Sequence, residues 1–453
     1  MNSKRLKRMK NSRSKCGLAL MCAVLAVVCG CTSQTVQTED TPSQQTAQED
    51  DDGVEFVVKG TTTPHQENNN GSEQSSGQKN ISAEDTDVPQ DGTASFNMSV
   101  AGDYIIYDSM YNYAYGLNGS DTYNFKPMVR NLRQFTEKCD INYYNQETVL
   151  AGDELPVSSY PMFVSPTEAG DAMVNIGYNL VSTATNHSLD GGEDGVLAQY
   201  DYWKKQKDVL MTGTYNSQQA RDEVRIKECN GIRYTMLSYT YATNGIPLPE
   251  GKDYLVNVWP TDFDINDPKS DQEYINYKKQ VKKDIEAVRD KVDFLIVTMH
   301  SGVEYAVDES EYQRDTAKFL AENGADLVIG THPHVIQPAE YIGDTLVYYS
   351  LGNLLCAQMQ DEYYNKVTSI LATFTVNKET TNGETKITFT NLQHELLYSY
   401  YNQGTWGEYC VIPFSNKEIK EFMPEYKEVY ETYKQQFTKR DPSLYVVPCA
   451  TGN

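Results

Sequence analysis

Positive charge is scarce in this chain of 453 residues, where 39 Lys and Arg stand against 63 Asp and Glu and the formal net charge is −24. Nucleic-acid binding requires Lys and Arg at the phosphates, so the composition argues against a nucleic-acid partner. An anionic polymer would have to be bound locally, through a metal ion or a few placed cations, against an unfavourable overall field.

Paired cysteine motifs and long apolar runs are also missing. Five cysteines follow Cys31, and none of them belongs to a C-x-x-C pair, which argues against a zinc ribbon or a dense disulfide framework. A single bridge between Cys410 and Cys449 stays open. The apolar stretch "CGLALMCAVLAVV" at 16–28 is too short to cross a bilayer, but it suits the core of a secretory signal.

The start of the chain carries the features of a lipoprotein leader. Seven Lys and Arg precede the apolar stretch, and "VCGC" at 28–31 ends it in small residues and a cysteine, like a bacterial lipobox. We therefore predict a signal peptide over 1–30 and lipidation of Cys31, which would anchor an extracytoplasmic protein to the bacterial membrane. The alternative is an uncleaved anchor followed by an ordinary buried cysteine. Loss of the leader would take the formal charge from −24 to −31.

Composition divides the rest of the chain into three parts. Residues 31–94 are rich in Gln, Thr, Ser, Asn and acids, which predicts a disordered tether. Residues 95–400 alternate short apolar runs with helix-like stretches, and this predicts an α/β domain with a largely buried sheet. Within it, 368–393 predicts a β-hairpin around Asn382 and Gly383. Residues 401–453 are predicted to be an extension packed on the domain, with a helix at 415–437.

Polar side chains recur where the predicted strands end. The residues are Asp103 after "SVAG", Glu147 after "INYYNQ", Asn186 and His187 after "LVSTAT", His300 after "LIVTM", and His332 after "LVIGT". In an open α/β sheet the carboxyl ends of the strands are where ligands bind. Each residue alone has an ordinary explanation, as a turn cap or a buried hydrogen-bonded histidine. Together they predict a metal site, because nitrogen and oxygen ligands without thiolate suit hydrolytic Mn, Fe or Zn.

The segment "GTHPHVIQP" at 330–338 adds a second imidazole to this set. The whole chain has only six histidines, and His332 and His334 flank a single proline just after an apolar run. An H-x-H pair alone is a weak signal for a metal site. Its position after a predicted strand, beside the other strand ends, strengthens that interpretation.

From about residue 97 to residue 355 these motifs resemble the CapA family of poly-γ-glutamate capsule synthesis proteins, a branch of the calcineurin-like metallophosphoesterase superfamily. The matching motifs, in order, are Gly102-Asp103, Asn145 and Glu147 in "NQE", Asn186, His187 and Asp190 in "NHSLDGG", His300 and Glu304 in "HSGVEY", His332 and His334 in "GTHPHV", and Ser350 and Asn353 in "YSLGN". The resemblance implies a calcineurin-like metallophosphatase fold, an α-β-β-α sandwich of mixed sheets flanked by helices, with a C-terminal β-hairpin and helix.

The resemblance also implies roles for these residues. Asp103, Glu147, Asn186, His300, His332 and His334 would hold one or two divalent ions (Mn, Fe or Zn) for hydrolysis. His187, oriented by Asp190, would protonate the leaving group, while Asn145, Glu304, Ser350 and Asn353 would contact substrate or support the ligands. The chain departs from ordinary metallophosphatases in lacking D-x-H, since Tyr104 and Ile105 follow Asp103, and in having Glu147 where they have Asp.

Two functions stay open at this point. One is a membrane-anchored metallohydrolase that cleaves a phosphoester, ester or amide bond in the synthesis or export of poly-γ-glutamate or another anionic envelope polymer. The other is a non-catalytic protein that uses the same metal cleft to bind or anchor such a polymer. Other capsule synthesis proteins are possible partners in either case. The complete histidine set favours a retained metal, and the missing D-x-H favours a changed or lost phosphatase activity.

Overall fold

The computed structural model describes residues 78–81, 91–117, 122–260, 268–360 and 363–451. The predicted leader, Cys31 and nearly all of the predicted tether lie outside these ranges. Within them, no helix combines the length and the apolar character needed to cross a membrane.

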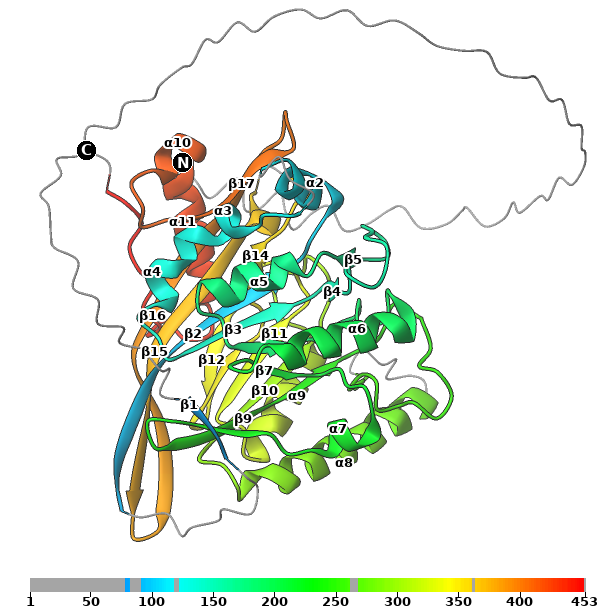
Figure 1. Cartoon of the computed structure of the whole chain (residues 1–453). Coiled ribbons are helices and arrows are strands. Elements are labelled where there is room, and N and C mark those ends of the chain that lie inside the picture. Colours follow the sequence, from blue (N-terminus) through cyan, green and yellow to red (C-terminus); the bar gives the residue numbers. More distant parts are fainter. Residues whose placement is uncertain (1–77, 82–90, 118–121, 261–267, 361–362, 452–453) are drawn as a thin grey trace, which may run out of the picture. The chain divides into compact units, whose positions relative to one another are not determined.

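Two mixed β-sheets form the centre of the described unit (Figure 1). In strand order, the seven-stranded sheet contains β1 (Gln78–Ile81), β8 (Ile226–Cys229), β9 (Ile232–Thr240), β10 (Phe294–His300), β11 (Leu327–Thr331), β13 (Thr345–Tyr348) and β12 (Ala339–Ile342). The eight-stranded sheet contains β17 (Gly407–Pro413), β16 (Glu384–Asn402), β15 (Thr368–Thr381), β2 (Gly92–Tyr104), β3 (Ile141–Gln146), β6 (Leu180–Ser182) and β7 (Leu210–Thr212), with β14 (Asn353–Leu355) paired to β2. A small sheet pairs β4 (Val149–Leu150) with β5 (Val164–Ser165).

Aromatic and aliphatic side chains from both sheets share one core. Phe96 of β2 packs against Tyr234 of β9 and Phe294 of β10, with ring centroids 6.1 and 5.9 Å apart. The central strands β2, β3, β6 and β7 run parallel, as do β9, β10, β11 and β13. Such strands are covered on both faces, which explains their continuous apolar runs. Burying this apolar surface between the sheets is the main favourable contribution to folding.

Helices cover the outer faces of the sheets (Figure 1). The helices are α2 (Asp108–Gly116), α3 (Lys126–Val129), η1 (Arg130–Leu132), α4 (Arg133–Thr136), α5 (Glu168–Asn175), α6 (Gly192–Lys205), α7 (Gln218–Asp222), α8 (Pro268–Arg289), α9 (Glu311–Glu322), η2 (Asn365–Val367), α10 (Ile419–Phe422) and α11 (Tyr426–Phe437). Val281 and Ile285 of α8 and Leu320 of α9 pack against the seven-stranded sheet. The architecture is therefore the predicted α/β class, with mixed sheets flanked by helices.

The predicted C-terminal hairpin is confirmed. β15 and β16 are antiparallel and join at Asn382 and Gly383, whose φ values of 55° and 80° suit a tight turn of the kind that hairpins prefer. The predicted helix at 415–437 is split into α10 and α11 because Pro424 disfavours a helical conformation at Met423, which is extended. Phe437 of α11 lies 4.8 Å from the ring of His394, so this helix packs on the sheet.

Two predicted boundaries differ from the structure. The strand β1 pairs with β8, and β2 begins at Gly92, so regular structure starts before residue 95. The boundary at residue 400 falls inside β16, and β17 continues the same sheet beyond it. The signal for β17 in the amino-acid pattern is weak because only seven residues form this strand. Cys410 and Cys449 are both free thiols.

Candidate metal centre

The predicted ligands gather where parallel strands of both sheets end. Asp103 lies next to the last residue of β2, Glu147 follows β3, His300 ends β10 and His332 follows β11. All four side chains are buried. The backbone N–H of His332 donates to Oδ2 of Asp103 at 3.1 Å, which joins the two sheets at this edge. The site therefore depends on the packing of one sheet against the other.

Asp103, Glu147 and His334 form the first group with metal-ligand spacing, since one ligand atom from each lies within 4.8 Å of the others. His334 places Nδ1 at 3.4 Å from Oδ2 of Asp103 and Nε2 at 3.5 Å from Oε1 of Glu147. Neither carboxylate oxygen of Glu147 forms a hydrogen bond with a described residue, although both are buried. Buried acceptors without donors are costly, so a cation between these residues would complete the group.

This group holds two carboxylates, Asp103 and Glu147, and one imidazole, His334. Burial raises the pKa of Glu147 well above its usual range; the charge of His334 opposes that rise, and the charges of Asp103 and Glu304 add to it. For His334 burial favours the neutral ring, but the charge of Glu147 and the hydrogen bond and charge of Asp103 raise its pKa to about 9. The protein thus attracts a proton to the place where a divalent ion would satisfy both carboxylates.

His332, His334 and Glu304 form a second group with the same spacing. Nδ1 of His332 is buried and has no hydrogen-bond partner in the described residues. Burial, with the nearby charges of His334 and His187, lowers the pKa of His332 well below its usual value, which keeps the ring neutral as a metal ligand must be. Glu304 is exposed at the mouth of the site. His334 belongs to both groups, so it lies between them.

Asn186 and His300 form a pair beside the second group. Nε2 of His300 lies 2.8 Å from Oδ1 of Asn186, and the rings of His300 and His332 are 4.9 Å apart. Nδ1 of His300 lies 2.8 Å from the hydroxyl of Thr331. Burial, followed by the charges of the neighbouring histidines, lowers the pKa of His300 well below its usual value. An N–H on Nδ1 directed to Thr331 would leave Nε2 and the Asn186 oxygen free to share an ion.

Two asparagines hold the ligands in place. Nδ2 of Asn145 donates to Oδ1 of Asp103 at 2.8 Å. Asn353 accepts a hydrogen bond from Nδ1 of His334 at 3.0 Å, which directs Nε2 of that ring to Glu147, and its amide nitrogen donates to the carbonyl of Lys366 at 2.8 Å. Both asparagines thus fix the orientation of predicted ligands through hydrogen bonds.

The backbone of this edge is unusually constrained. His332 and His334 have φ values of 95° and 59°, in a region that residues other than glycine seldom adopt. Ser350 accepts a hydrogen bond from the N–H of Gly352 at 3.2 Å and so shapes the turn before β14. Gly102 approaches the Gly352 carbonyl so closely that an added Cβ would lie 1.9 Å from its oxygen. The absence of a side chain at Gly102 thus allows β2 to contact the turn at Gly352.

His187 and Asp190 lie beside the ligands as a pair. Nδ1 of His187 donates to Oδ2 of Asp190 at 2.6 Å, and the same oxygen accepts the N–H of Phe163 at 2.7 Å. The His187 ring packs edge-on against Phe163 with centroids 4.8 Å apart. With Nδ1 engaged, the free position of the ring is Nε2, which can exchange a proton with a bound molecule.

Several residues of the site had no clear signal in the sequence. Asn244 accepts a hydrogen bond from Asn186 at 3.0 Å and lies 3.2 Å from His187. The hydroxyl of Thr185 donates to the backbone carbonyl of Glu147 at 2.8 Å. At the mouth, the Lys366 ammonium lies 4.2 Å from the ring centre of Tyr305.

Comparison with known proteins supports the motif assignment. A family model described as bacterial capsule synthesis protein PGA_cap matches residues 97–358. The PGA biosynthesis protein CapA of Bacillus subtilis (strain 168) is 27% identical over 196 residues, which cover 42% of this chain and 46% of that protein. The capsule biosynthesis protein CapA of Bacillus anthracis is 25% identical over 193 residues, or 42% of this chain and 43% of that protein. The matched region spans less than half the length of both relatives.

Three solved structures are similar in part. A hypothetical protein from Thermus thermophilus aligns with a TM-score of 0.35 and 14% identity, over 66% of this chain and 99% of that chain. GAP50, the anchor in the inner membrane complex of Plasmodium, aligns with a TM-score of 0.29 and 11% identity. The alignment covers 65% of this chain and 89% of that chain. A 5′-nucleotidase from Candida albicans SC5314 aligns with a TM-score of 0.35 and 11% identity. The alignment covers 76% of this chain and 58% of that chain. These scores are too low to assign a fold, which here follows from the strands and helices of the chain itself.

Proposed function

Because the chain belongs to the bacterial capsule synthesis protein family, we propose that it is a metal-dependent hydrolase of an envelope polymer. The bond cleaved would be a phosphoester, an ester or an amide. We take poly-γ-glutamate or another anionic polymer as the substrate class, because the curated relatives are named for PGA and capsule biosynthesis. The protein would act in the synthesis or export of that polymer.

One observation supports the metal most directly. Both carboxylate oxygens of Glu147 and Nδ1 of His332 are buried without a hydrogen-bond partner among the described residues, in the two groups whose spacing suits a cation. Buried polar atoms are nearly always satisfied, so these three atoms indicate a missing binding partner. The donor set of carboxylates, imidazoles and one amide fits Mn, Fe or Zn. Asp103, Glu147 and His334 would hold one ion, and His332 with Asn186 and His300 would hold a second where two are bound.

The chain's own residues supply the remaining chemistry. When bound, a divalent ion provides Lewis-acid stabilisation of the negative charge that develops in hydrolysis. His187 would donate a proton from Nε2 to the leaving group, with Asp190 fixing the ring through Nδ1 at 2.6 Å. Two residues at the mouth of the site would contact the substrate. Glu304 would do so beside His332 and His334, and the Lys366 ammonium would do so from its position over the Tyr305 ring.

We also propose the location of the protein. The basic, apolar and small-residue sequence that leads into Cys31 supports cleavage before this residue and its lipidation. Anchored in this way, the domain would meet polymer outside the cytoplasm. Other capsule synthesis proteins are candidate partners at the membrane.

A polymer-binding protein without turnover is the second candidate, and one observation favours it. Ile105 occupies the position where ordinary metallophosphatases have the histidine of D-x-H, and its side chain is buried with Phe163 and Cys356. That apolar cluster offers no imidazole to the metal, so one ion would be held by fewer ligands than in those enzymes. A weakly held ion could serve binding better than hydrolysis.

Metal analysis and a hydrolysis screen on the purified protein would decide between the two candidates. The screen would include poly-γ-glutamate, an aryl phosphate ester and an aryl carboxylate ester, with the metal found in the protein added back. We expect a bound divalent metal and turnover of at least one substrate. Metal without turnover on the full panel would favour the binding protein, and a protein without divalent metal would contradict both forms of the proposal.

A further inference from the structure

A pocket of about 340 Å³ lies away from the metal centre, between the end of α6, the start of β7 and β8. Leu210, the first residue of β7, lines the pocket, whereas the metal ligands lie at the carboxyl ends of the parallel strands. The pocket is therefore at the opposite edge of the sheet. None of the predicted site residues lines it.

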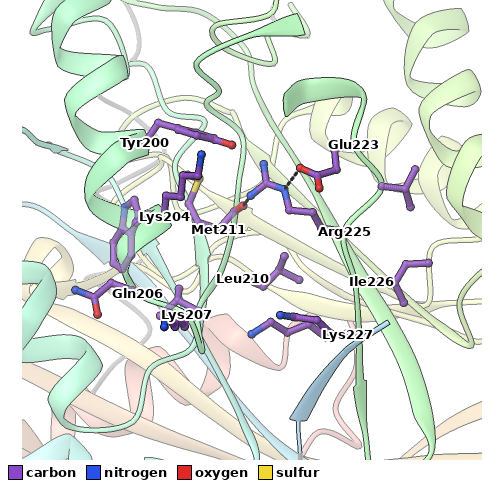
Figure 2. Close-up of a pocket in the computed structure, with 14 residues that line it drawn as sticks. Tyr200, Lys204, Gln206, Lys207, Leu210, Met211, Glu223, Arg225, Ile226 and Lys227 are labelled. Atoms are coloured by element: carbon purple, nitrogen blue, oxygen red, sulfur yellow. Dashed lines mark hydrogen bonds and ion pairs between the residues drawn. The ribbon is translucent and has the colours of Figure 1, made fainter. Parts of the chain in front are cut away.

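Cations dominate the charge of this pocket. Lys204, Lys207, Arg225 and Lys227 line it, and Glu223 is its single acidic lining residue (Figure 2). Lys204 and Lys207 are exposed, and neither forms an ion pair with a described carboxylate. In a chain with a formal charge of −24, four cations around one cavity stand out from the overall composition.

Of the four cations, Lys227 gives the strongest support for an anion site because it is buried. Its side chain donates to the backbone carbonyl of Asp208 at 2.6 Å, and no described carboxylate forms an ion pair with it. Burial lowers the pKa of this ammonium, and the charge of Asp208 opposes the change only in part. A buried ammonium held by one carbonyl and without a carboxylate partner is costly. An anion in the pocket would offset that cost.

Arg225 and Trp203 present further donors. Arg225 is fixed by the carbonyl of Met211 at 3.1 Å and lies over the rings of Tyr200 and Tyr215, with Cζ 5.8 and 5.6 Å from the ring centres. Figure 2 shows Arg225 paired with Glu223 on one side, an ion pair of 4.0 Å. Trp203, which also lines the pocket, has a buried indole N–H without a partner among the described residues. A guanidinium held in this way loses little entropy when it binds an anion.

We propose that this pocket binds a short polycarboxylate segment, such as several consecutive residues of a γ-linked glutamate chain. The choice of ligand rests on the proposed function, because the same cations could hold another anion. An acidic protein must bind an acidic polymer through local cations, and salt screens the repulsion of distant carboxylates beyond about 8 Å in physiological conditions. Cations placed at several points around one cavity suit several carboxylates on a flexible chain better than one compact anion.

Calorimetric titration of the full chain with a γ-linked glutamate hexamer tests the proposal. The double variant Lys204→Gln/Lys207→Gln should bind about tenfold more weakly, with a shallower dependence on salt, and Lys227→Met should weaken binding at least as much. The control is Lys205→Gln, which removes one positive charge next to Lys204 at the end of α6, at a residue that does not line the pocket. It should bind like the wild type. Circular dichroism verifies that each variant is folded. If Lys227→Met does not fold, the test rests on Lys204→Gln/Lys207→Gln, in which both substituted residues are exposed.

Three results would overturn the inference: absence of hexamer binding to the wild type, equal weakening by Lys205→Gln, or competition by inorganic phosphate as strong as that by the hexamer. His332→Ala separates this proposal from the proposed function. It should lower metal content and leave unchanged the part of hexamer binding that Lys204→Gln/Lys207→Gln weakens. If it abolished hexamer binding while the pocket variants did not, the polymer would bind only at the metal centre. Hexamer binding without hydrolysis of any substrate would contradict the hydrolase and leave the pocket intact.

Discussion

The backbone N–H of His332 donates to Oδ2 of Asp103 across 3.1 Å, although the two residues are 229 positions apart. Asp103 belongs to a strand of the eight-stranded sheet, and His332 follows a strand of the seven-stranded sheet. The hydrogen bond therefore exists only after the sheets have packed. The Asp103 carboxylate thus orients the H-x-H loop through Oδ2. Its other oxygen, Oδ1, accepts a hydrogen bond from Asn145.

Substitution at the H-x-H pair should lower metal affinity. His332→Ala and His334→Ala each remove one nitrogen that lies within ligand spacing of the neighbouring carboxylates. We expect affinity to fall about tenfold or more, and more for His334 because it belongs to both groups. Elemental analysis after dialysis against a weak chelator measures the change. His394→Gln is the control, a buried histidine outside both groups. Unchanged metal content in the His332/His334 double variant would show that the pair is merely structural.

The close approach at Gly102 should be required for stability. An alanine Cβ there would lie 1.9 Å from the Gly352 oxygen, so β2 and the turn before β14 would have to separate. We expect Gly102→Ala to lower the free energy of unfolding by about 3 kcal/mol or more. Gly116→Ala, at the end of α2 with no heavy atom within 4 Å of the added Cβ, should change stability by no more than about 1 kcal/mol. Urea unfolding of both variants gives the comparison, and similar midpoints would refute the steric argument.

Much of the candidate site could be predicted because its proposed ligands follow apolar runs. Asp103, Glu147, His300 and His332 each stand at the end of a run that had to become a buried strand, and parallel strands bring such ends to one edge. The contacts among them were not predictable from that pattern. Which oxygen of Asp103 faces His332, or that Asn353 orients His334, depends on side-chain packing across two sheets.

Other features lacked any local signal. Asn244 reaches Asn186 and His187 from a loop 58 and 57 positions away, and a turn sequence says nothing about such a distant contact. Short elements such as β1 and β17 were missed for a related reason. Four to seven residues carry little periodicity, and their pairing partners decide their conformation.

Two neighbours on β16 should give opposite pH dependences of stability. Burial raises the pKa of Glu395 to about 7, and burial lowers the pKa of His394 to about 4. The Glu395 contribution is fully present below the unfolded pKa near 4.5 and is lost as the pH rises through 7. The His394 contribution is present above 6.5 and is lost as the pH falls through 4. Each change is on the order of 3 kcal/mol, and the two nearly cancel between about pH 4.5 and 6.5.

Glu395→Gln should uncover this cancellation. Relative to the wild type, the variant should gain unfolding free energy as the pH rises from 4.5 to about 7, because the buried carboxylate no longer has to ionise. Urea unfolding at several pH values measures the difference, in which all other titrating groups cancel. Glu384→Gln is the exposed control on the same strand. Parallel pH profiles for Glu395→Gln and the wild type would contradict the prediction.

Lipidation is expected at Cys31, where the basic and apolar leader ends in small residues. Metabolic labelling with a fatty acid should mark the wild-type protein, and Cys31→Ser should abolish the label. Cys29→Ser, two residues upstream, serves as a control that should still be labelled. Continued labelling of the Cys31 variant would remove the basis for anchoring at this residue.

His187 separates hydrolysis from mere metal binding. Its Nδ1 is engaged by Asp190 at 2.6 Å, and it belongs to neither group with metal-ligand spacing. As a proton donor it should contribute roughly 10²- to 10⁴-fold to kcat and little to metal affinity. His187→Ala should therefore keep metal and fold and lose turnover, and Asp190→Asn should lose part of the rate by releasing the ring.

Paired assays of metal content and hydrolysis on the wild type and His187→Ala give three distinct outcomes. Retained metal with lost turnover supports the role as proton donor. Joint loss of metal and turnover would make His187 a ligand, and the assignment of Nε2 to the leaving group would then be wrong. If the metal-loaded wild type hydrolyses nothing on the substrate panel, the apolar cluster around Ile105 gains weight, and the centre is better understood as a site that binds polymer without cleaving it.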